Sequence, residues 1–228
     1  MSGLIKSIQE RDPANPTFFE VILAYPGFHA VGLHRVSHFL WGHKLKAIAR
    51  LWAHLSRLLT GIEIHPGAQI GKNLFIDHGM GVVIGGTAII GDNVTLYQGV
   101  TLGGKGGSVC GKRHPTLSND CIIGAGAQIL GNITVGEGSK VGASAVVTKN
   151  IPDGCTAVGN PARLLTCKED DGKAYGMPRE WIDPIAEAID GLLKDVEELK
   201  AGAKPKAKKT TKAQSKDTYA EHWKGSGI

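Results

Sequence analysis

Three histidines stand in polar or glycine-flanked stretches, where an imidazole can exchange a proton with a bound substrate. They are His65 in E-I-H-P-G, His78 in I-D-H-G-M-G and His114 in K-R-H-P. A histidine exposed at a turn can take a proton from an alcohol at neutral pH, so His78, between Asp77 and Gly79, is the candidate general base. The alternative interpretation is a structural histidine at a corner of the chain.

A carboxylate that could orient the His78 imidazole is Glu63, which precedes His78 by slightly less than three six-residue repeats. If one turn of the fold takes three such repeats, the two side chains lie close, and the carboxylate would fix the tautomer and charge of the imidazole. The alternative is an ordinary surface glutamate. Five other histidines, in the apolar region before Gly61, are interpreted as packing or surface residues: His29, His34, His38, His43 and His54.

The elements that would position these side chains follow from a six-residue apolar repeat. One series runs Ile64, Ile70, Ile76, Val82, Ala88, Val94 and Val100, and a second runs Leu117, Ile123, Ile129, Val135, Val141 and Val147. Helices repeat apolar residues every three or four positions and strands every two, so a period of six is typical of neither. It predicts a parallel β-helix, in which each hexad forms one short strand and a turn, and three hexads form one coil.

A loop is predicted to leave the β-helix between the two series, because they are out of phase by one residue. It covers residues 103–116 and begins G-G-K-G-G-S-V-C-G-K-R-H-P. Loops on a rigid scaffold are common binding sites, and this one contains Arg113 beside His114. The alternative is a passive insertion.

Helical segments are predicted on both sides of the β-helix, which is expected to cover residues 62–166. Residues 1–61 should form two or three helices, opened by Asn15-Pro16 and closed by Gly61. Residues 178–201 should form a coiled-coil-like helix, and residues 202–228 a disordered lysine-rich linker and tail. The seam of that helix consists of Ile182, Ile185, Ile189, Leu192, Val196 and Leu199. The predicted fold class is therefore α+β.

Composition narrows the function classes. The chain has 228 residues, 42% of them hydrophobic, which suffices for a sizeable core. Its net charge is +5, but the six lysines between Lys204 and Lys216 exceed that surplus, so we expect no nucleic-acid partner. The four cysteines form no C-x-x-C pair, and the sequence shows neither a signal peptide nor a membrane span, which favours a reducing, cytoplasmic location.

Several motifs together closely resemble serine O-acetyltransferases, within the hexapeptide-repeat acyltransferase superfamily. The likeness extends over about residues 11–166. The motifs are Arg11-Asp12-Pro13-Ala14, Gly27-Phe28-His29-Ala30, Glu63-Ile64-His65-Pro66, Asp77-His78, Thr101-Leu102-Gly103-Gly104, Arg113-His114-Pro115 and Gly159-Asn160-Pro161-Ala162-Arg163. The resemblance implies that the β-helix is left-handed.

It also implies a reaction, in which acetyl-CoA gives its acetyl group directly to the hydroxyl of L-serine, forming O-acetyl-L-serine and CoA for cysteine biosynthesis. No permanent cofactor and no metal are expected, and Cys110, in the loop, is interpreted as incidental. His78 matches the family's catalytic base, and Glu63 matches its orienting carboxylate, a position often held by aspartate. The serine-binding residues implied are Asp12 and Asp77 for the ammonium group, and Arg113 and His114 for the carboxylate.

The resemblance further implies partners. The family binds acetyl-CoA in a groove between subunits. Isoleucine-rich seams such as that of residues 178–201 favour trimers, so we expect a homotrimer, with a hexamer as the alternative. The residues that match the acetyl-CoA groove are Gly104, Gly124, Ala125 and Ala143, with Lys140 and Lys149 as candidates for the CoA phosphates. The C-terminal Gly-Ser-Gly-Ile resembles the family tail, whose final isoleucine, here Ile228, binds O-acetylserine sulfhydrylase.

Three alternatives come from other classes. A sugar or other hydroxyl acetyltransferase would keep His78 but would not need Asp12 or the Arg113-His114 pair. A γ-class carbonic anhydrase would hold zinc with three histidines, for which His65, His78 and His114 are available. A non-catalytic scaffold that binds the sulfhydrylase through its tail would need none of the serine-site residues.

Overall fold

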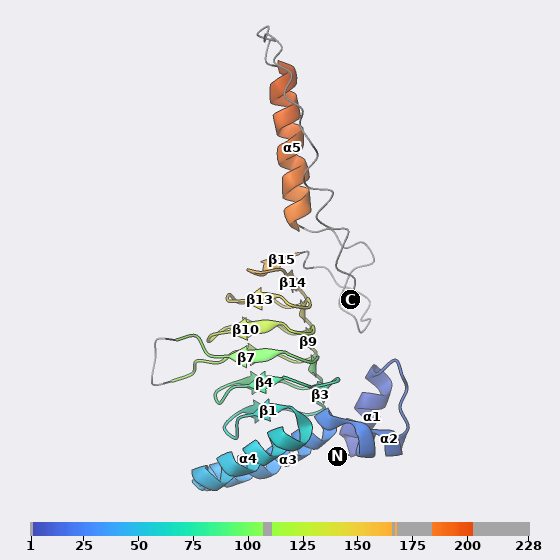
Figure 1. Cartoon of the computed structure of the whole chain (residues 1–228), viewed down its shortest axis with the longest axis vertical. Helices are drawn as coiled ribbons and strands as arrows, with labels where there is room; N and C mark the ends of the chain where they lie inside the picture. Colours follow the sequence, from blue (N-terminus) through green and yellow to red (C-terminus); the bar gives the residue numbers. More distant parts are fainter. Residues whose placement is uncertain (1, 107–110, 166, 168–183, 203–228) are drawn as a thin grey trace, which may run out of the picture. The chain divides into compact units, whose positions relative to one another are not determined.

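The computed structural model describes residues 2–106, 111–165, 167 and 184–202. Four helices precede the strands, rather than the two or three expected from the sequence, and a fifth helix follows them (Figure 1). The helices are α1 (Ser2–Arg11), α2 (Phe18–Ala24), α3 (Pro26–Gly42), α4 (Lys46–Thr60) and α5 (Pro184–Gly202). None of the helices in this part of the chain has the length and apolar content needed to cross a bilayer.

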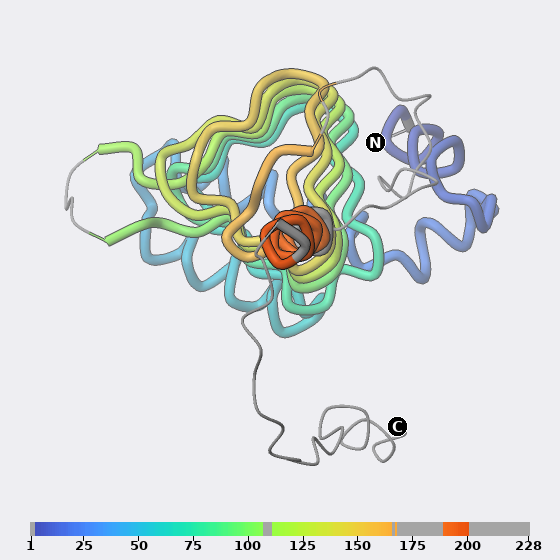
Figure 2. The backbone as a smooth tube through the Cα atoms, turned by 90° about the horizontal axis from the view of Figure 1, so that it is seen from above, coloured from blue at the N-terminus to red at the C-terminus, as the bar shows by residue number. Residues whose placement is uncertain are grey.

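The strands form three sheets that wrap around one axis, as the six-residue repeat predicts (Figure 2). One sheet has the order β1-β4-β7-β10-β13, the second β11-β8-β5-β2 and the third β15-β14-β12-β9-β6-β3. Every strand pair is parallel except β14 with β15. The strands are β1 (Glu63–Ile64), β2 (Gln69–Ile70), β3 (Phe75–Ile76), β4 (Val83–Ile84), β5 (Ile89–Ile90), β6 (Thr95–Leu96), β7 (Thr101–Gly103), β8 (Thr116–Leu117), β9 (Ile122–Ile123), β10 (Gln128–Leu130), β11 (Thr134–Val135), β12 (Lys140–Val141), β13 (Val146–Val147), β14 (Thr156–Val158) and β15 (Arg163–Leu164).

The core is a stack of aliphatic side chains inside the coil. Leu96, Leu102, Ile123 and Ile129 are fully buried, and each stands on the inward-facing position of its strand. Burial of this apolar surface is the main stabilising term, because the removal of apolar area from water is the dominant favourable contribution to folding. The predicted α+β class, with helices before a parallel β-helix and a helix after it, is confirmed.

The register corrects one part of the sequence analysis. Ile64 pairs with Ile84, so the first coil is longer than the expected three hexads. The additional length lies in the corner between β3 and β4, where His78, Gly79 and Gly81 all have positive φ. Because of this additional length, Ile84 and not Val82 stacks on Ile64, although Val82 continues the six-residue series. The coil bulges at the candidate base, His78.

The predicted loop lies between β7 and β8, and Figure 2 shows its two described arms projecting from the coil. Gln69 pairs with Ile89, and Ile89 in turn pairs with Thr116, so the coil that contains the loop is longer than the coil before it. Gly103 still belongs to β7, and Thr116 already belongs to β8. Residues 107–110, and Cys110 with them, lie outside the described residues.

The N-terminal helices begin and end at recognisable signals, although not all are those expected. Helix α2 starts at Phe18 with Thr17 as its N-cap, in a capping box with Glu20, so the expected start at Asn15-Pro16 is wrong. Gly61 ends α4, as predicted, and it adopts the left-handed conformation. Helices α3 and α4 pack together beneath the first coil (Figure 1).

The C-terminal part of the chain forms a separate unit, Ile182–Ile228. Helix α5 begins at Pro184, so the predicted start at residue 178 falls outside the described residues, as does the predicted tail, 203–228. Before this unit, Cys155 and Cys167 form a disulfide, which sequence analysis did not predict. This bond is at odds with the reducing location that the cysteine pattern favours. The antiparallel pairing of β14 with β15 folds the chain back and brings these two cysteines together.

Candidate active site

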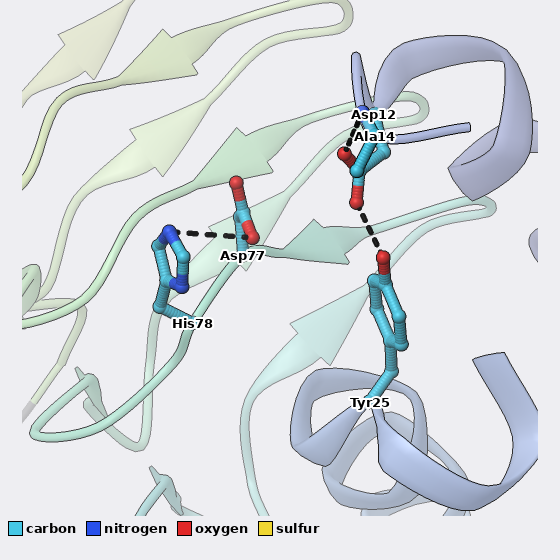
Figure 3. Close-up of polar contacts among 5 residues, drawn as sticks. All are labelled: Asp12, Ala14, Tyr25, Asp77 and His78. Atoms are coloured by element: carbon cyan, nitrogen blue, oxygen red, sulfur yellow. Dashed lines mark hydrogen bonds and ion pairs between the residues drawn. The ribbon is translucent and has the colours of Figure 1, made fainter. Parts of the chain in front are cut away.

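The structure brings three predicted site residues into one hollow. Asp12, Asp77 and His78 line a cavity of about 380 Å³ between the end of α1, the start of α3 and the corner after β3 (Figure 3). The other lining residues are Pro13, Ala14, Ala24, Tyr25, Pro26 and Ile76. Two carboxylates and an imidazole thus face a space that suits a small cationic substrate.

His78 stands on the bulge of the first coil. Its φ is +58°, a left-handed conformation that histidine adopts more readily than most residues. The side chain is 73% exposed, and its Nε2 lies 3.9 Å from the Asp77 Oδ1 atom. This exposure allows an acceptor hydroxyl to approach the imidazole directly.

Asp77 is the less exposed partner, with 17% of its side chain accessible. Burial raises the pKa of this carboxyl group, and the negative charge of Asp12 adds to the increase, whereas His78 lowers the pKa. Two carboxylates that share a poorly solvated hollow repel each other unless a cation lies between them. The pair is therefore suited to bind an ammonium group.

The raised pKa of Asp77 gives a testable effect on stability. The folded chain binds this proton more tightly than the unfolded chain does, so stability falls as pH rises through the interval between the two pKa values. We expect Asp77→Asn to raise the Tm by about 2 °C at neutral pH. This gain should shrink as the wild-type carboxyl becomes protonated. Thermal unfolding between about pH 4 and about pH 8 measures it, and a constant difference would contradict the assignment.

Asp12 is held by two hydrogen bonds. Its Oδ1 accepts from the backbone N–H of Ala14 at 2.8 Å, and its Oδ2 accepts from the Tyr25 hydroxyl at 2.6 Å (Figure 3). Burial, the hydrogen bond to Asp12 and the nearby negative charges raise the pKa of Tyr25, so Tyr25 remains a donor. Sequence analysis missed Tyr25, although it directly precedes the Pro26-Gly27 start of α3.

His114 lies elsewhere on the same chain, buried against the second coil. Its Nδ1 accepts from the backbone N–H of Thr87 at 3.2 Å and lies 2.8 Å from the Thr87 hydroxyl oxygen. That oxygen also accepts from the backbone N–H groups of Arg113 and His114. Burial, with the charges of Arg113 and Lys112, lowers the pKa of His114. The imidazole is therefore neutral, with its proton on Nε2, and Thr87 is a second residue that sequence analysis missed.

Two glycines make room for the His114 ring. A Cβ on Gly85 would lie 2.0 Å from the ring, and a Cβ on Gly104 would lie 3.3 Å from His114 Nε2. Gly104 was predicted to admit acetyl-CoA, and the structure places it beside His114 and the Arg113 side chain. Among the described residues that line the hollow of His78, neither Arg113 nor His114 occurs.

Glu63, too, does not occur among the described residues that line that hollow. Its Oε2 forms an ion pair with Arg57 at 2.8 Å, and it lines a second hollow with His54 and His65. The register places Glu63 opposite Val83 on the next coil. The corner after His78 lies directly beside Ile62, since a Cβ on Gly79 would stand 2.5 Å from the Ile62 Cδ1 atom. The orienting contact of Glu63 with His78 stays a prediction.

The predicted acetyl-CoA residues differ in what surrounds them. A Cβ on Gly124 would lie 2.6 Å from the backbone nitrogen of Ala143, so close stacking of two coils alone requires glycine there. Ala125 is half-buried, and Ala143 and Lys149 are exposed. Lys140 is only 8% exposed, which is unfavourable to a role in binding CoA phosphates from solvent.

The third candidate histidine has a local structural role. His65 Nδ1 accepts from the backbone N–H of Gly67 at 2.9 Å, and its ring contacts Trp41 edge to face. Within the described part of the chain, no group of three or more histidine, cysteine, aspartate or glutamate side chains is arranged to hold a metal ion.

Comparison with known proteins shows the family to which this chain is related. Residues 114–149 match the bacterial transferase hexapeptide family (six repeats). The serine acetyltransferase of Synechococcus elongatus is 58% identical over 158 residues, which cover 69% of this chain and 64% of that protein. The serine acetyltransferase of Bacillus subtilis is 50% identical over 197 residues, which cover 86% of this chain and 90% of that protein.

Solved structures of serine acetyltransferases are similar to this chain as well. Soybean serine acetyltransferase complexed with serine is 46% identical, with a TM-score of 0.69 over 72% of this chain and 68% of that chain. The match confirms the left-handed parallel β-helix expected from the resemblance, and it argues against the carbonic anhydrase alternative. The similarity to the Bacillus protein covers nearly the full length of both chains. The chain therefore belongs to the serine acetyltransferase family of hexapeptide-repeat acyltransferases.

Proposed function

We propose that this protein transfers the acetyl group of acetyl-CoA to the hydroxyl of L-serine. The observation that carries the proposal is the convergence of Asp12, Asp77 and His78 on one hollow (Figure 3). The two carboxylates match the ammonium group of an amino acid, and the exposed imidazole matches its hydroxyl. A sugar acceptor would need the histidine but not the paired carboxylates.

His78 is the proposed general base. Its imidazole takes the proton from the serine hydroxyl while the oxygen attacks the thioester carbonyl carbon of acetyl-CoA. The tetrahedral intermediate then collapses, the carbon–sulfur bond breaks, and the imidazolium returns the proton to the departing CoA thiolate. The reaction is balanced without a covalent enzyme intermediate or a permanent cofactor.

Arg113 and His114 are the proposed ligands of the serine carboxylate. A guanidinium binds a carboxylate in a planar fork, and the neutral His114 offers its Nε2–H beside Gly104. Since these two residues do not line the hollow of His78 in their own chain, we propose that a second copy supplies them. The site then lies between subunits, and acetyl-CoA binds in the same groove.

Glu63 is the proposed orienting residue for His78. Its Oε2 pairs with Arg57, and a carboxylate can accept hydrogen bonds at both oxygens. The pair is about half exposed, and such surface ion pairs contribute about 0–1 kcal/mol, so a turn of the carboxylate toward the imidazole costs little.

We propose that the subunits assemble as a homotrimer, as the resemblance to the family implies. Helix α5 supports self-association, because Ile189, Leu192, Val196 and Leu199 form an exposed seam at spacings of three and four. Ile189 and Val196 occupy the a positions of a heptad, and Leu192 and Leu199 occupy the d positions. Asp195 is then at a g position and Lys200 at an e position, so both flank the seam. In a parallel assembly Asp195 of one helix faces Lys200 of the next, whereas an antiparallel assembly sets like charges together.

A charge exchange tests this arrangement. We expect Asp195→Lys to raise the concentration at which the oligomer dissociates by about 5-fold, because each attractive pair becomes repulsive. The double variant Asp195→Lys with Lys200→Asp should restore it. Sedimentation equilibrium over a dilution series is the measurement. An unchanged single variant, or a double variant that fails to recover, would contradict parallel packing of α5.

The proposal also includes a partner protein and a cellular location. The C-terminal Ile228 is proposed to bind O-acetylserine sulfhydrylase, the enzyme that would consume the product, because a free carboxylate on an isoleucine suits capture by a backbone pocket. We place the reaction in the cytoplasm, where acetyl-CoA and free serine are both present.

The experiment that tests the function is CoA release from acetyl-CoA with L-serine as acceptor. L-homoserine and a galactoside serve as competing acceptors. We expect release with L-serine and little with the other two. Release that depends on the galactoside alone would move the protein to the sugar-acetylating class and would remove the serine-binding assignments.

A further inference from the structure

The last residue of α1, Arg11, ties this helix to the β-helix. Its guanidinium has five acceptors: the backbone carbonyl oxygens of Ser7, Asn73, Asn93 and Val94, and the hydroxyl oxygen of Thr95. The bonds from Nη1 to Asn93 and Thr95 measure 2.8 and 3.0 Å. The guanidinium also lies over the ring of Phe75, 5.4 Å from its centroid.

Four of these acceptors, all except Ser7 of α1 itself, lie on two successive coils. Asn73 and Asn93 occupy equivalent corners, both with positive φ, and the Asn73 side-chain amide donates to the Asn93 side-chain oxygen at 3.0 Å. A planar guanidinium reaches both corners at once, whereas a lysine ammonium acts as a point charge on a flexible stem. Arginine therefore fixes the end of α1 to a rigid edge of the solenoid.

The residue that follows this contact is Asp12. Its backbone N–H closes the last turn of α1 by donating to the Ile8 carbonyl oxygen at 2.8 Å. Its carboxylate is held from the other side by the Tyr25 hydroxyl, at the junction of α2 and α3. The position of the Asp12 carboxylate is thus set by the β-helix through Arg11 and by the helical layer through Tyr25.

We propose that Arg11 and Tyr25 are positioning residues that place the Asp12 carboxylate for the substrate ammonium group. The inference rests on the proposed function, since it assumes that Asp12 binds that group. Neither side chain needs to touch the substrate. Loss of either contact lets Asp12 move relative to Asp77 and His78, and a misplacement of about 1 Å costs on the order of 100-fold in a preorganised site.

Steady-state kinetics with both substrates varied test the proposal. We expect Arg11→Lys to raise the KM for L-serine by about 10-fold or more, with the KM for acetyl-CoA unchanged and kcat within about 3-fold of wild type. Lys6→Gln is the matched control on the same helix. Its ammonium is exposed and pairs only at 3.7 Å with Glu10, so both KM values should stay at wild-type levels.

Tyr25→Phe gives a second, milder variant that removes one hydroxyl. We expect it to raise the KM for L-serine by about 5-fold, the size of one ordinary hydrogen bond, because Asp12 keeps its bond from the Ala14 N–H. In an Asp12→Asn background the same substitution should add little, because the group that it positions has lost its charge.

The outcomes separate this inference from the proposed function. Absence of serine-dependent CoA release by the wild-type protein overturns both. If the wild type is active and Asp12→Asn raises the KM for L-serine, but Arg11→Lys and Tyr25→Phe do not, the positioning role alone is overturned. Equal increases in both KM values, together with a lower Tm, would assign Arg11 to general stability and would also overturn it.

Discussion

Replacement of His78 by asparagine is expected to lower kcat by about 10²- to 10⁴-fold while leaving the KM for L-serine within about 3-fold. The imidazole provides the base for the serine hydroxyl and the acid for the CoA thiolate, and the amide of asparagine supplies neither. Asparagine is preferred over alanine here because the φ of His78 is +58°, and asparagine adopts this conformation at little cost. The loss therefore reports proton transfer rather than a rebuilt corner.

His43→Asn is the control for this variant. His43 caps α3 on the exposed surface, where its Nδ1 lies 2.9 Å from the Phe39 carbonyl oxygen. Stopped-time assays of CoA release should give wild-type kcat for the control. A His78 variant with nearly full kcat would exclude this residue as the base and leave the hollow with a binding role only.

Apolar periodicity predicted the fold well because burial in a β-helix is simple. One inward position of each hexad must hold an apolar side chain that stacks on its neighbours, so the period of six directly predicted strands such as those of Ile123 and Ile129. The bulge after Ile76 was not visible in the same way. In the sequence, Val82 continues the period of six. In the structure it occupies the second inward position of its hexad, and Ile84 is the residue that stacks on Ile64.

The site was only partly predictable for a related reason. Asp12, Asp77 and His78 carry charge or a titratable ring, and their motifs single them out. Tyr25 and Thr87 act through a single hydroxyl whose partner is distant in the sequence, and no spacing rule links them to Asp12 or His114. Residues of this kind become visible only when the coils and helices are placed together.

Glycines at close contacts are a third class of residue that sequence analysis did not connect with the site. Gly27 is one of them, and it contacts the strand that leads to the proposed base, His78. It lies in the first turn of α3, and a Cβ there would stand 2.2 Å from the carbonyl oxygen of Ile76 and 2.9 Å from its Cβ. Ile76 immediately precedes Asp77 and His78. Helix α3 thus packs against the strand that presents the proposed base, with no space for a methyl group between them.

Gly27→Ala is therefore expected to reduce both stability and activity. Overpacking of this contact should cost about 3 kcal/mol, which for a chain of this size lowers the Tm by about 6–12 °C. Movement of Ile76 also displaces His78 from the proposed acceptor position, and we expect kcat/KM for L-serine to fall by about 100-fold. Thermal unfolding and CoA release measure the two effects on the same preparation.

Gly42→Ala, at the other end of α3, is the matched control. Its Cβ would meet no atom within 4 Å, so the substitution should be neutral or raise stability by up to about 1 kcal/mol through helix propensity. If Gly27→Ala behaved like Gly42→Ala, α3 would not be packed on β3 as closely as described, and the position of the Asp77-His78 corner would not depend on the helical layer. Opposite results at the two glycines would show that the N-terminal helices take part in shaping the site, beyond covering one end of the solenoid.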